Sequence, residues 1–463
     1  MVAAAPAAIK REGRPMHEKG EPHPRLTGPE EAALYHRASD HGFFTLLWAE
    51  AGDASTGRPA LKIQRAYRLS AMAQVIAALD QNRDTWISQA EFDRPDRRIV
   101  HLVRLGLCFV DLDTYKTPWR ETPPESLLTR FLGYCDDESI PAPSLVVHSG
   151  RGLQTKWLLE RPLPRAALPR WNAVQKELVA RLELFGADPG ARDASRVLRL
   201  VDTVNTRSGQ PVRVLWVQME DQAIRRYPFE LLAETLLPVA RDALPLKRPA
   251  PQESRAPLHV LSGGKTGHLR VFSGRQLAWD RLDDLRRLAR RRGWTERGVP
   301  HGYRSKYLHW CLNFLLLSGA VPAHRLFQEA HALAREVCPD FDKDVRSVLS
   351  TLYRKAKAYE AGERIEFNGK TYPPLYTPRN RTLLALFDVR DDEMRELKTL
   401  ITPEEAAERH RARNREAKDR ASYLKTAEQR QAYVRVLRAK GLSIREIASE
   451  IGLSKSQIHR YLQ

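Results

Sequence analysis

The sequence predicts an α+β protein, in which a mixed α/β part is followed by an all-helical part and a small helical unit at the C-terminal end. Three observations lead to this fold class. Short apolar runs with strand spacing alternate with helical patterns between residues 40 and 217. From residue 270 onward, apolar residues recur at helical spacing, with glycines between the segments. In the last segment, a glycine separates two short amphipathic helical patterns.

Composition bounds the class of protein. The chain has 463 residues, enough for roughly two to four domains with a sizeable core. Lys and Arg number 76 against 57 Asp and Glu, which gives a net charge of +19. Such a charge predicts a polyanionic partner, most simply nucleic acid. An acidic membrane surface ranks low, because neither end carries a basic amphipathic anchor or a lipidation motif.

The cysteines predict neither a zinc site nor a disulfide framework. Cys108, Cys135, Cys311 and Cys338 are far apart, and none belongs to a C-x-x-C pair. The N-terminal residues lack the apolar core of a signal peptide, and no stretch approaches the roughly 20 apolar residues of a membrane span. We therefore expect a protein of a reducing, bacterial cytoplasm.

The α/β part follows from the order of its segments. Residues 1–30 are rich in Ala, Pro, Gly, Glu and Lys without periodicity, which predicts disorder. Pro124 suits the first turn of a helix, where its missing N–H is not needed. The expected strands are 43–48, 85–90, 109–113, 144–148, 156–159, 197–200 and 212–217, and the expected helices are 69–79, 124–134 and 168–185.

The helical part begins after a proline-rich linker. Gly293, Gly319 and Pro339 separate expected helices at 277–292, 304–318, 323–337 and 343–359. The predicted domain boundaries are a disordered 1–30, an α/β domain 31–240, a linker 241–268, a helical domain 269–370, a charged linker or helix 371–425 and a C-terminal unit 426–463.

The C-terminal unit has the pattern of a helix-turn-helix. Ser443 can cap a helix over 444–451, with Glu446 in the capping-box position, and Gly452 makes the turn. The second helix begins with polar and basic residues, as a recognition helix does; the alternative is an ordinary helical hairpin. The expected duplex-DNA contacts are Ser454, Lys455, Ser456, Gln457, His459 and Arg460.

An aspartate pair interrupts the most apolar strand. Asp111 and Asp113 are two positions apart, so both side chains should point to one face. Carboxylates in an apolar strand are costly to bury unless a cation receives them. Mg²⁺ or Mn²⁺ prefers such oxygen ligands, although an arginine partner for one of them is the alternative.

Two further segments carry polar side chains of the right kind for a nucleotide site. The first segment lies between the expected strands 144–148 and 156–159. There, Gly150 and Gly152 allow a close backbone approach, and the basic Arg151 and Lys156 are nearby. After the helix at 168–185, aspartates and arginines alternate around a strand. Asp188 could complete a carboxylate trio, and Asp193 is the runner-up, although it also suits an arginine partner. The expected nucleotide-binding residues are Ser149, Gly150, Arg151, Gly152, Gln154, Lys156, Arg199 and Asn205.

In this order the motifs resemble those of the archaeo-eukaryotic primase superfamily, closest to the RepB-like plasmid replication primases. The resemblance covers residues 40 to 220: D-x-D at Asp111 and Asp113, then the S-G-x-G loop, then the Asp/Arg segment. It implies a two-layer catalytic domain with an RRM-like core. It also implies that Asp111, Asp113 and Asp188 are catalytic metal ligands. Many members have a phosphate-binding His where this chain has Gln154.

The resemblance implies a primase or primase-polymerase that joins NTPs or dNTPs on a single-stranded DNA template in the replication of a plasmid or mobile element. Two-metal nucleotidyl transfer suits the carboxylates. A helicase or initiator would be a separate partner. The alternatives are a DNA-binding replication initiator or regulator with a degenerate primase domain, and a metal-dependent nuclease. A relaxase is disfavoured, since the chain shows no His-hydrophobe-His triad.

Overall fold

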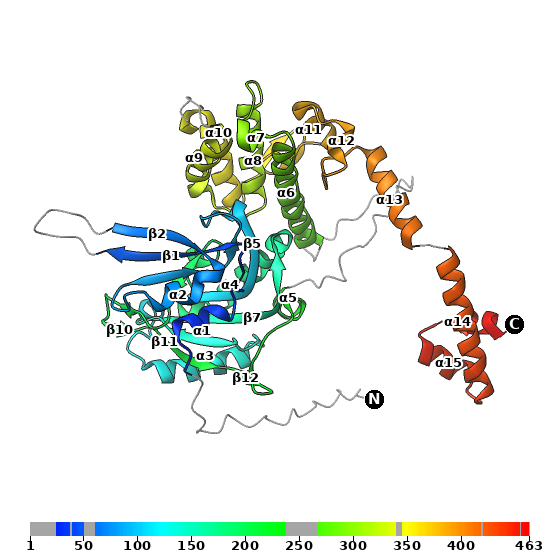
Figure 1. Ribbon diagram of the computed structural model, residues 1–463, viewed down its shortest axis with the longest axis horizontal. Helices are drawn as coiled ribbons and strands as arrows, with labels where there is room; N and C mark the ends of the chain where they lie inside the picture. Colours follow the sequence, from blue (N-terminus) through cyan, green and yellow to red (C-terminus); the bar gives the residue numbers. More distant parts are fainter. Residues whose placement is uncertain are drawn as a thin grey trace, which may run out of the picture. The chain divides into compact units, whose positions relative to one another are not determined.

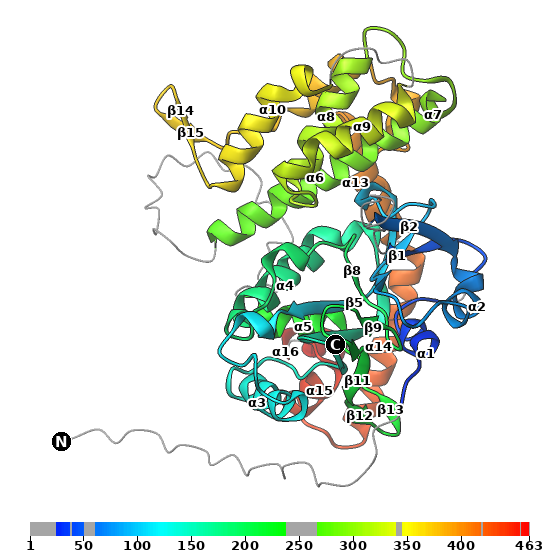
Figure 2. The ribbon, with the colours of Figure 1, turned by 90° about the vertical axis from the view of Figure 1, so that its left-hand side faces the viewer.

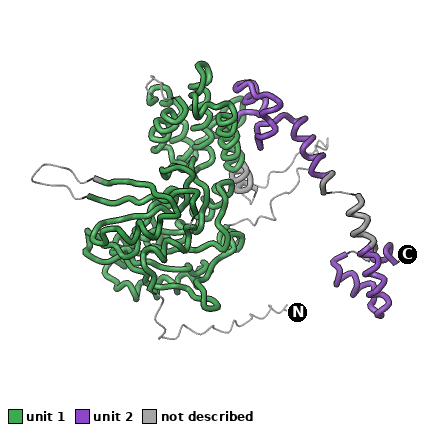
Figure 3. The backbone as a smooth tube through the Cα atoms, in the orientation of Figure 1, with its two compact units in different colours: residues 1–377 green, residues 378–463 purple. Residues whose placement is uncertain are grey.

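The computed structural model divides the chain into two compact units (Figure 3). Unit 1 ends at Thr377 and unit 2 begins at Pro378. The structure describes residues 25–37, 39–50, 61–237, 266–338, 345–417, 420–453 and 455–462, without the side chains of 61, 266–273, 415–417, 420–428 and 455–456. No helix among these residues is long and apolar enough to cross a bilayer.

One antiparallel sheet organises the first part of unit 1 (Figure 1). Its strand order is β11-β6-β7-β5-β4-β1-β3-β8, and β2 pairs with β1. The strands are β1 Phe43–Glu50, β2 Leu61–Arg68, β3 Thr85–Ser88, β4 Glu91–Phe92, β5 Leu102–Leu112, β6 Leu145–His148, β7 Leu153–Pro164, β8 Val197–Arg199 and β11 Arg213–Val217. The short pairs are β9 Val204–Asn205 with β10 Gln210–Pro211, and β12 Met219–Glu220 with β13 Ala223–Ile224. This architecture confirms the predicted α+β class.

Helix α4 fixes the central strand β5 from one side. The Trp171 indole donates to the carbonyl of Leu107 at 2.9 Å, and its ring packs 5.9 Å from Phe109. The Gln175 amide bonds both the N–H and the C=O of Phe109, at 3.0 and 2.9 Å, in place of a neighbouring strand. These contacts hold β5 just before it reaches Asp111. The helices of this part are α1 Gly28–Ala33, α2 Met72–Ala77, α3 Pro124–Asp137, α4 Leu168–Arg181 and α5 Phe229–Leu236.

The prediction that residues 1–30 are disordered is wrong for the last residues of this segment, which belong to helix α1. The helix begins at Gly28, and Glu30 accepts the backbone N–H of Thr27 at 2.8 Å. A tertiary contact that the local composition does not reveal secures it: Glu31 and Lys156 form a fully buried ion pair at 2.6 Å. Residues 1–24 of the predicted disordered segment lie outside the described residues, as do 241–265 of the predicted linker.

A bundle of helices forms the rest of unit 1. Its helices are α6 Thr266–Arg291, α7 Trp294–Arg297, α8 Arg304–Leu317, α9 Leu326–Val337 and α10 Val345–Glu360. An exposed hairpin follows, with β14 Ile365–Phe367 and β15 Lys370–Tyr372, and Figure 2 shows it projecting beyond α10. The sequence analysis missed this hairpin, although its Asn-Gly turn at Asn368 and Gly369 is a strong hairpin signal.

Unit 2 is helical throughout its described residues. Its helices are α11 Asn380–Phe387, α12 Asp391–Met394, α13 Pro403–Ala417, α14 Arg420–Ala439, α15 Ile444–Ile451 and α16 Lys455–Leu462. The predicted capping box is present: Glu446 accepts the N–H of Ser443 at 2.8 Å. Gly452 adopts a left-handed conformation with φ of 67°. Helices α14, α15 and α16 pack around one hydrophobic core, which includes Val434, Leu437, Ile447 and Ile458.

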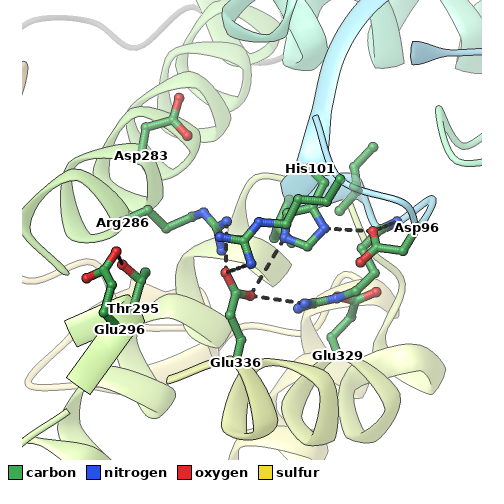
Figure 4. A network of polar contacts seen from close by, with 12 residues as sticks. Asp96, His101, Asp283, Arg286, Thr295, Glu296, Glu329 and Glu336 are labelled. Atoms are coloured by element: carbon green, nitrogen blue, oxygen red, sulfur yellow. Dashed lines mark hydrogen bonds and ion pairs between the residues drawn. The ribbon is translucent and has the colours of Figure 1, made fainter. Parts of the chain in front are cut away.

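A polar network joins the sheet to the helical bundle within unit 1 (Figure 4). Its centre is the Glu336 carboxylate of α9, which lies 3.1 Å from Arg98, 3.4 Å from Arg286 and 3.7 Å from His101 Nε2. The other ring nitrogen of His101 bonds Asp96 at 2.6 Å. The position of α9 against the sheet therefore depends on charged groups as well as on apolar packing.

Burial alone would keep His101 neutral and Glu336 protonated, but their partners reverse both tendencies. Burial lowers the pKa of His101, yet the hydrogen bond to Asp96 and the nearby carboxylate of Glu336 outweigh burial, so the pKa is raised. Burial likewise raises the pKa of Glu336, yet the nearby His101 and the charges of Arg286 and Arg98 lower it strongly. The partners therefore favour the charged form of each group.

The network predicts that folding stability depends on pH. The raised pKa of His101 contributes stability that is complete below about pH 6.5 and is lost as the pH rises through the folded value. The lowered pKa of Glu336 contributes stability above about pH 4.3 that is lost as the pH falls.

Thermal unfolding between about pH 6 and 9 tests the His101 contribution, since most of the His titration lies in this range. We expect His101→Gln to be less stable than wild type at the acidic end and to lack the decline on the alkaline side. The exposed His41 provides the control, since His41→Gln should retain the decline. If His101→Gln shows the wild-type pH dependence, the network does not act in this way.

Candidate active site

Backbone pairing brings the three predicted aspartates together. The N–H of Asp113 donates to the carbonyl of Gly186 at 2.9 Å, and the N–H of Asp188 donates to the carbonyl of Asp111 at 3.0 Å. Between these bonds, Leu112 and Ala187 form an antiparallel bridge. The loop after α4 therefore runs alongside the end of β5.

The second aspartate lies just beyond the strand and not inside it. β5 ends at Leu112, and Asp113 begins the 3-10 turn Thr114–Lys116. The prediction that one strand contains both Asp111 and Asp113 is therefore wrong for Asp113, which lies one residue beyond the end of β5. Gly186 approaches this turn closely, because its φ is 75° and its missing Cβ would lie 2.8 Å from the Asp113 carbonyl.

The three carboxylates repel one another, and nearby basic side chains offset part of this repulsion. Burial, together with the charges of Asp113 and Asp188, raises the pKa of Asp111 to about 6. Lys116 pairs with Asp113 at 2.5 Å, and Arg196 pairs with Asp188 at 3.2 Å. No hydrogen bond or ion pair is found for the Asp111 carboxylate within the described residues.

These carboxylates suit a divalent cation by their chemistry. Asp111 forms no ion pair among the described residues, although the charges of Arg196 and Arg199 act on it, while Lys116 and Arg196 pair with its two neighbours. The described part of the chain contains no cluster of three or more such side chains already close enough to hold a metal. Binding would thus require Lys116 and Arg196 to release their aspartates.

The predicted glycine loop packs directly against the aspartate strand. A Cβ at Gly152 would lie 2.2 Å from the Leu112 carbonyl, so only glycine allows this approach. Gly150 has a φ of 89°, and its missing Cβ would lie 2.5 Å from Asn205. The Asn205 amide donates to the carbonyl of Ser149 at 2.9 Å. Asn205 therefore holds the loop in place through the backbone, and its expected contact with a nucleotide stays a prediction.

A pocket of about 580 Å³ opens beside the aspartates, with walls from the sheet, the glycine loop and the helical bundle. Two of its buried polar atoms, Gln154 Oε1 and Arg151 Nε, have no hydrogen-bond partner in the described structure. Because buried polar atoms are normally paired, these two indicate where a ligand or ordered water would bind. The pocket is lined by Leu47, Lys62, Trp86, Arg97, Asp111, Asp113, Tyr115, Ser149, Arg151, Gln154, Asp193, Arg196, Val197, Arg199, Asn205, His324, Arg325 and Gln328.

Several predicted residues lie in this pocket with partners of their own. The Arg151 guanidinium stacks 4.0 Å over the Tyr115 ring. Arg199 pairs with Asp84 and lies 4.8 Å over the Trp86 ring. Asp188 is not a lining residue and reaches the pocket only through its ion pair with Arg196.

Asp193, the runner-up for the third carboxylate, has a local role. Its carboxylate accepts the N–H of Ser195 at 3.0 Å and also the Ser195 hydroxyl. Arg325 lies 3.7 Å from the same carboxylate. Asp193 is thus occupied by its own turn, whereas Asp188 is joined by backbone bonds to the Asp111 strand.

Lys156 does not belong to the site. Its side chain is fully buried in the ion pair with Glu31, and its ammonium lies 4.7 Å over the Tyr35 ring. The expectation that Lys156 binds phosphate is wrong, because its ammonium group is fully buried and already paired with Glu31. The residues that the sequence analysis missed include Lys62, Trp86, Arg97 and Arg325, which come from separate segments and carry no shared motif.

The predicted DNA-contacting residues lie at the C-terminal end. Gln457, His459 and Arg460 are exposed on α16, as that role requires. Ser454 lies outside the described residues, and the side chains of Lys455 and Ser456 are not described.

Comparison with known proteins finds a similar replication protein but no matching family model. The chain is 26% identical over 326 residues to a replication protein of Clostridium perfringens, and the match covers 69% of each chain. This similarity agrees with the resemblance predicted from the motifs.

Solved structures similar to this chain come from primases. The AEP domain of the cyanophage S-2L primase-polymerase is 17% identical, with a TM-score of 0.31, and the match covers 44% of this chain and 94% of that one. The catalytic domain of primase RepB′, in complex with initiator DNA, is 16% identical with a TM-score of 0.27, over 45% and 93%. Primase RepB′ itself is 15% identical with a TM-score of 0.27, over 72% and 99%.

The position of Lys156 predicts that its substitution affects stability and not nucleotide binding. Lys156→Met leaves the Glu31 carboxylate buried and unpaired, which we expect to cost about 3–5 kcal/mol of unfolding free energy. Urea unfolding measures this loss, and adding Glu31→Gln should restore most of it, since no buried charge then remains. A stable Lys156→Met protein that binds nucleotide poorly would contradict this assignment.

Proposed function

We propose that this chain is a primase that synthesises primers on single-stranded DNA by nucleotidyl transfer, in the replication of a plasmid or mobile element. The observation that carries the proposal is the backbone pairing of residues 111–113 with 186–188 beside a cation-lined pocket. That pairing keeps three carboxylates at one strand end, and a divalent cation would offset the repulsion that Lys116 and Arg196 relieve only in part. Similarity to a replication protein also supports the role.

The aspartates and the residues of the glycine loop would have separate roles in this reaction. Asp111, Asp113 and Asp188 would hold Mg²⁺ or Mn²⁺, which would activate a 3′-hydroxyl and neutralise the leaving pyrophosphate. The attacking oxygen forms a bond to the α-phosphorus of an NTP or dNTP, while the bond from that phosphorus to pyrophosphate breaks. Arg151 and Gln154 line the pocket, and Gln154 could donate a hydrogen bond to a nucleotide through its amide nitrogen without carrying charge.

The rest of the chain would supply DNA contacts. The net charge of +19 suits a protein that follows phosphate backbones. We propose that α15 and α16 act as a helix-turn-helix on duplex DNA, through the exposed Gln457, His459 and Arg460. A helicase or initiator would be supplied by another protein.

Primer synthesis on single-stranded DNA with labelled NTPs or dNTPs and Mg²⁺ or Mn²⁺ tests the proposal. We expect wild type to make short oligomers, and Asp111→Asn/Asp113→Asn to lose at least on the order of 10²-fold in rate, as when key charge stabilisation is removed. The exposed Asp137 is the matched control, and Asp137→Asn should keep full activity. If the wild type makes nothing but binds duplex DNA, the chain is an initiator with a degenerate primase domain, and nicked DNA without pyrophosphate would indicate a nuclease.

The same assay tests whether Asp188 or Asp193 is the third carboxylate of the metal site. Because Asp188 is tied to the Asp111 strand, we expect Asp188→Asn to abolish synthesis as the double variant does. Asp193→Asn should retain catalysis at saturating nucleotide, since its carboxylate serves its own turn. The reverse pattern would make Asp193 the third ligand.

A further inference from the structure

The β14–β15 hairpin concentrates large apolar side chains at the surface. Phe367 is 65% exposed, the highest value among the large apolar residues that the structure describes, and Tyr376, which follows β15, is 57% exposed. Ile365 and Tyr372 are each 45% exposed. Figure 2 shows the hairpin projecting away from α10. Single apolar residues at a surface need no explanation, but four of them in one short segment indicate a contact surface.

The register of the two strands separates their side chains by chemistry. Side chains alternate along a strand, so residues that pair, and those two positions away, share a face. The acid of the two strands, Glu366, pairs with Thr371 and lies on one face. The opposite face, which we call the aromatic face, carries two rings, one aliphatic group and one cation, from Phe367, Tyr372, Ile365 and Lys370.

The helical bundle holds the base of the hairpin but leaves its strands exposed. Leu375 is fully buried, and the carbonyl of Tyr376 accepts the amide of Asn313 in α8 at 3.0 Å. The Tyr376 ring lies 6.1 Å from the ring of Trp310, also in α8. All six residues of the two strands are exposed. The hairpin therefore presents its side chains from a fixed base.

Packing does not explain the aromatic face, and neither does a protein partner. A two-stranded hairpin gains little stability by itself, and this one adds no buried side chain to the bundle. Each strand has three residues, so its edges offer few backbone groups to a strand of another chain. Lysine is depleted from the cores of protein interfaces, so Lys370 beside the rings favours an anionic partner.

The helix that leads into the hairpin is basic as well. The only acid of α10 is Glu360, whose carboxylate accepts the N–H of Ala323 at 2.6 Å. Against it stand four cations of the same helix, Arg346, Arg354, Lys355 and Lys357. Rings beside cations suit single-stranded nucleic acid, because unpaired bases can stack on the rings while phosphates meet the cations. A duplex would not offer its base faces, since they are already stacked on one another.

We propose that the β14–β15 hairpin binds single-stranded DNA away from the aspartate pocket, with Phe367 and Tyr372 stacking on unpaired bases and Lys370 meeting the phosphate backbone. The inference rests on the proposed function, since the bound strand would be the template, and it assigns part of the helical bundle to template binding. Phe367 and Tyr372 are diagonal neighbours, which lie about 7–8 Å apart in such pairs, so each ring can hold a separate base. Stacking of this kind tolerates any sequence.

Fluorescence anisotropy of a labelled single-stranded oligonucleotide of mixed sequence, titrated with the full-length protein, tests the proposal. We expect Phe367→Ala/Tyr372→Ala to weaken binding roughly tenfold or more, as when stacking on two rings is lost. Phe367→Leu/Tyr372→Leu should bind almost as weakly, since leucine keeps the apolar contact but has no ring. The matched control is Met219→Ala, because Met219 is 47% exposed on the separate hairpin β12–β13, and it should bind as wild type.

The salt dependence of the same titration tests the lysine. Lys370→Gln should lower the slope of log affinity against log salt by roughly 0.7, the value for one phosphate contact on a single strand. The double alanine variant should keep most of its defect at high salt, because stacking is not screened. A duplex of the same sequence should bind equally well to wild type and to the double alanine variant.

Unchanged single-strand affinity in the folded double alanine variant overturns the proposal, and so does an equal loss of duplex affinity. A variant that changes only its oligomeric mass or its melting temperature also overturns it, and assigns the aromatic face to a second copy or to another segment of this chain. If single strands bind through the hairpin while wild type makes no primer, the hairpin site stands and the primase proposal fails. If primers are made while single-strand binding does not depend on the hairpin, the primase proposal stands and the hairpin site fails.

Discussion

Repulsion among the carboxylates of Asp111, Asp113 and Asp188 is the constraint on which the candidate site depends. Side chains with like charge would separate if they were free to move, but here their backbones are hydrogen-bonded to one another. Trp171 and Gln175 bond one edge of the strand at Leu107 and Phe109, and Gly186 lets the second segment pair with the same edge at Asp113. The backbone therefore keeps the three carboxylates together at an electrostatic cost.

The arrangement of basic residues follows from the same constraint. Lys116 and Arg196 offset two of the aspartates, and Arg199 and Arg325 at the pocket are paired with Asp84 and Asp193. The helical bundle contributes to the lining of the pocket, because its attachment through Glu336 places Arg325 there.

Local patterns were enough for much of the fold and part of the site. The apolar run of β5, the glycine loop and the capping box at Ser443 are encoded by neighbouring residues, and the structure has them. Lys156 could not be placed correctly, because its partner Glu31 is remote in the sequence and directly follows the segment predicted to be disordered. Arg97 and Arg325 share no motif with the aspartates, so only tertiary packing reveals that they meet. The β14–β15 hairpin could have been predicted from its Asn-Gly turn, because that signal is local.

The bridge between Leu112 and Ala187 has a consequence for how the chain folds. Contacts between residues so distant in sequence are slow to form, since the intervening chain must first be ordered. The strand β7, the glycine loop and helix α4 all lie in that interval. A chain emerging from the ribosome therefore exposes β5 and its two aspartates before their partner segment has been synthesised. The backbone pairing of Asp111 with Asp188 would therefore be completed late, after α4 has been synthesised.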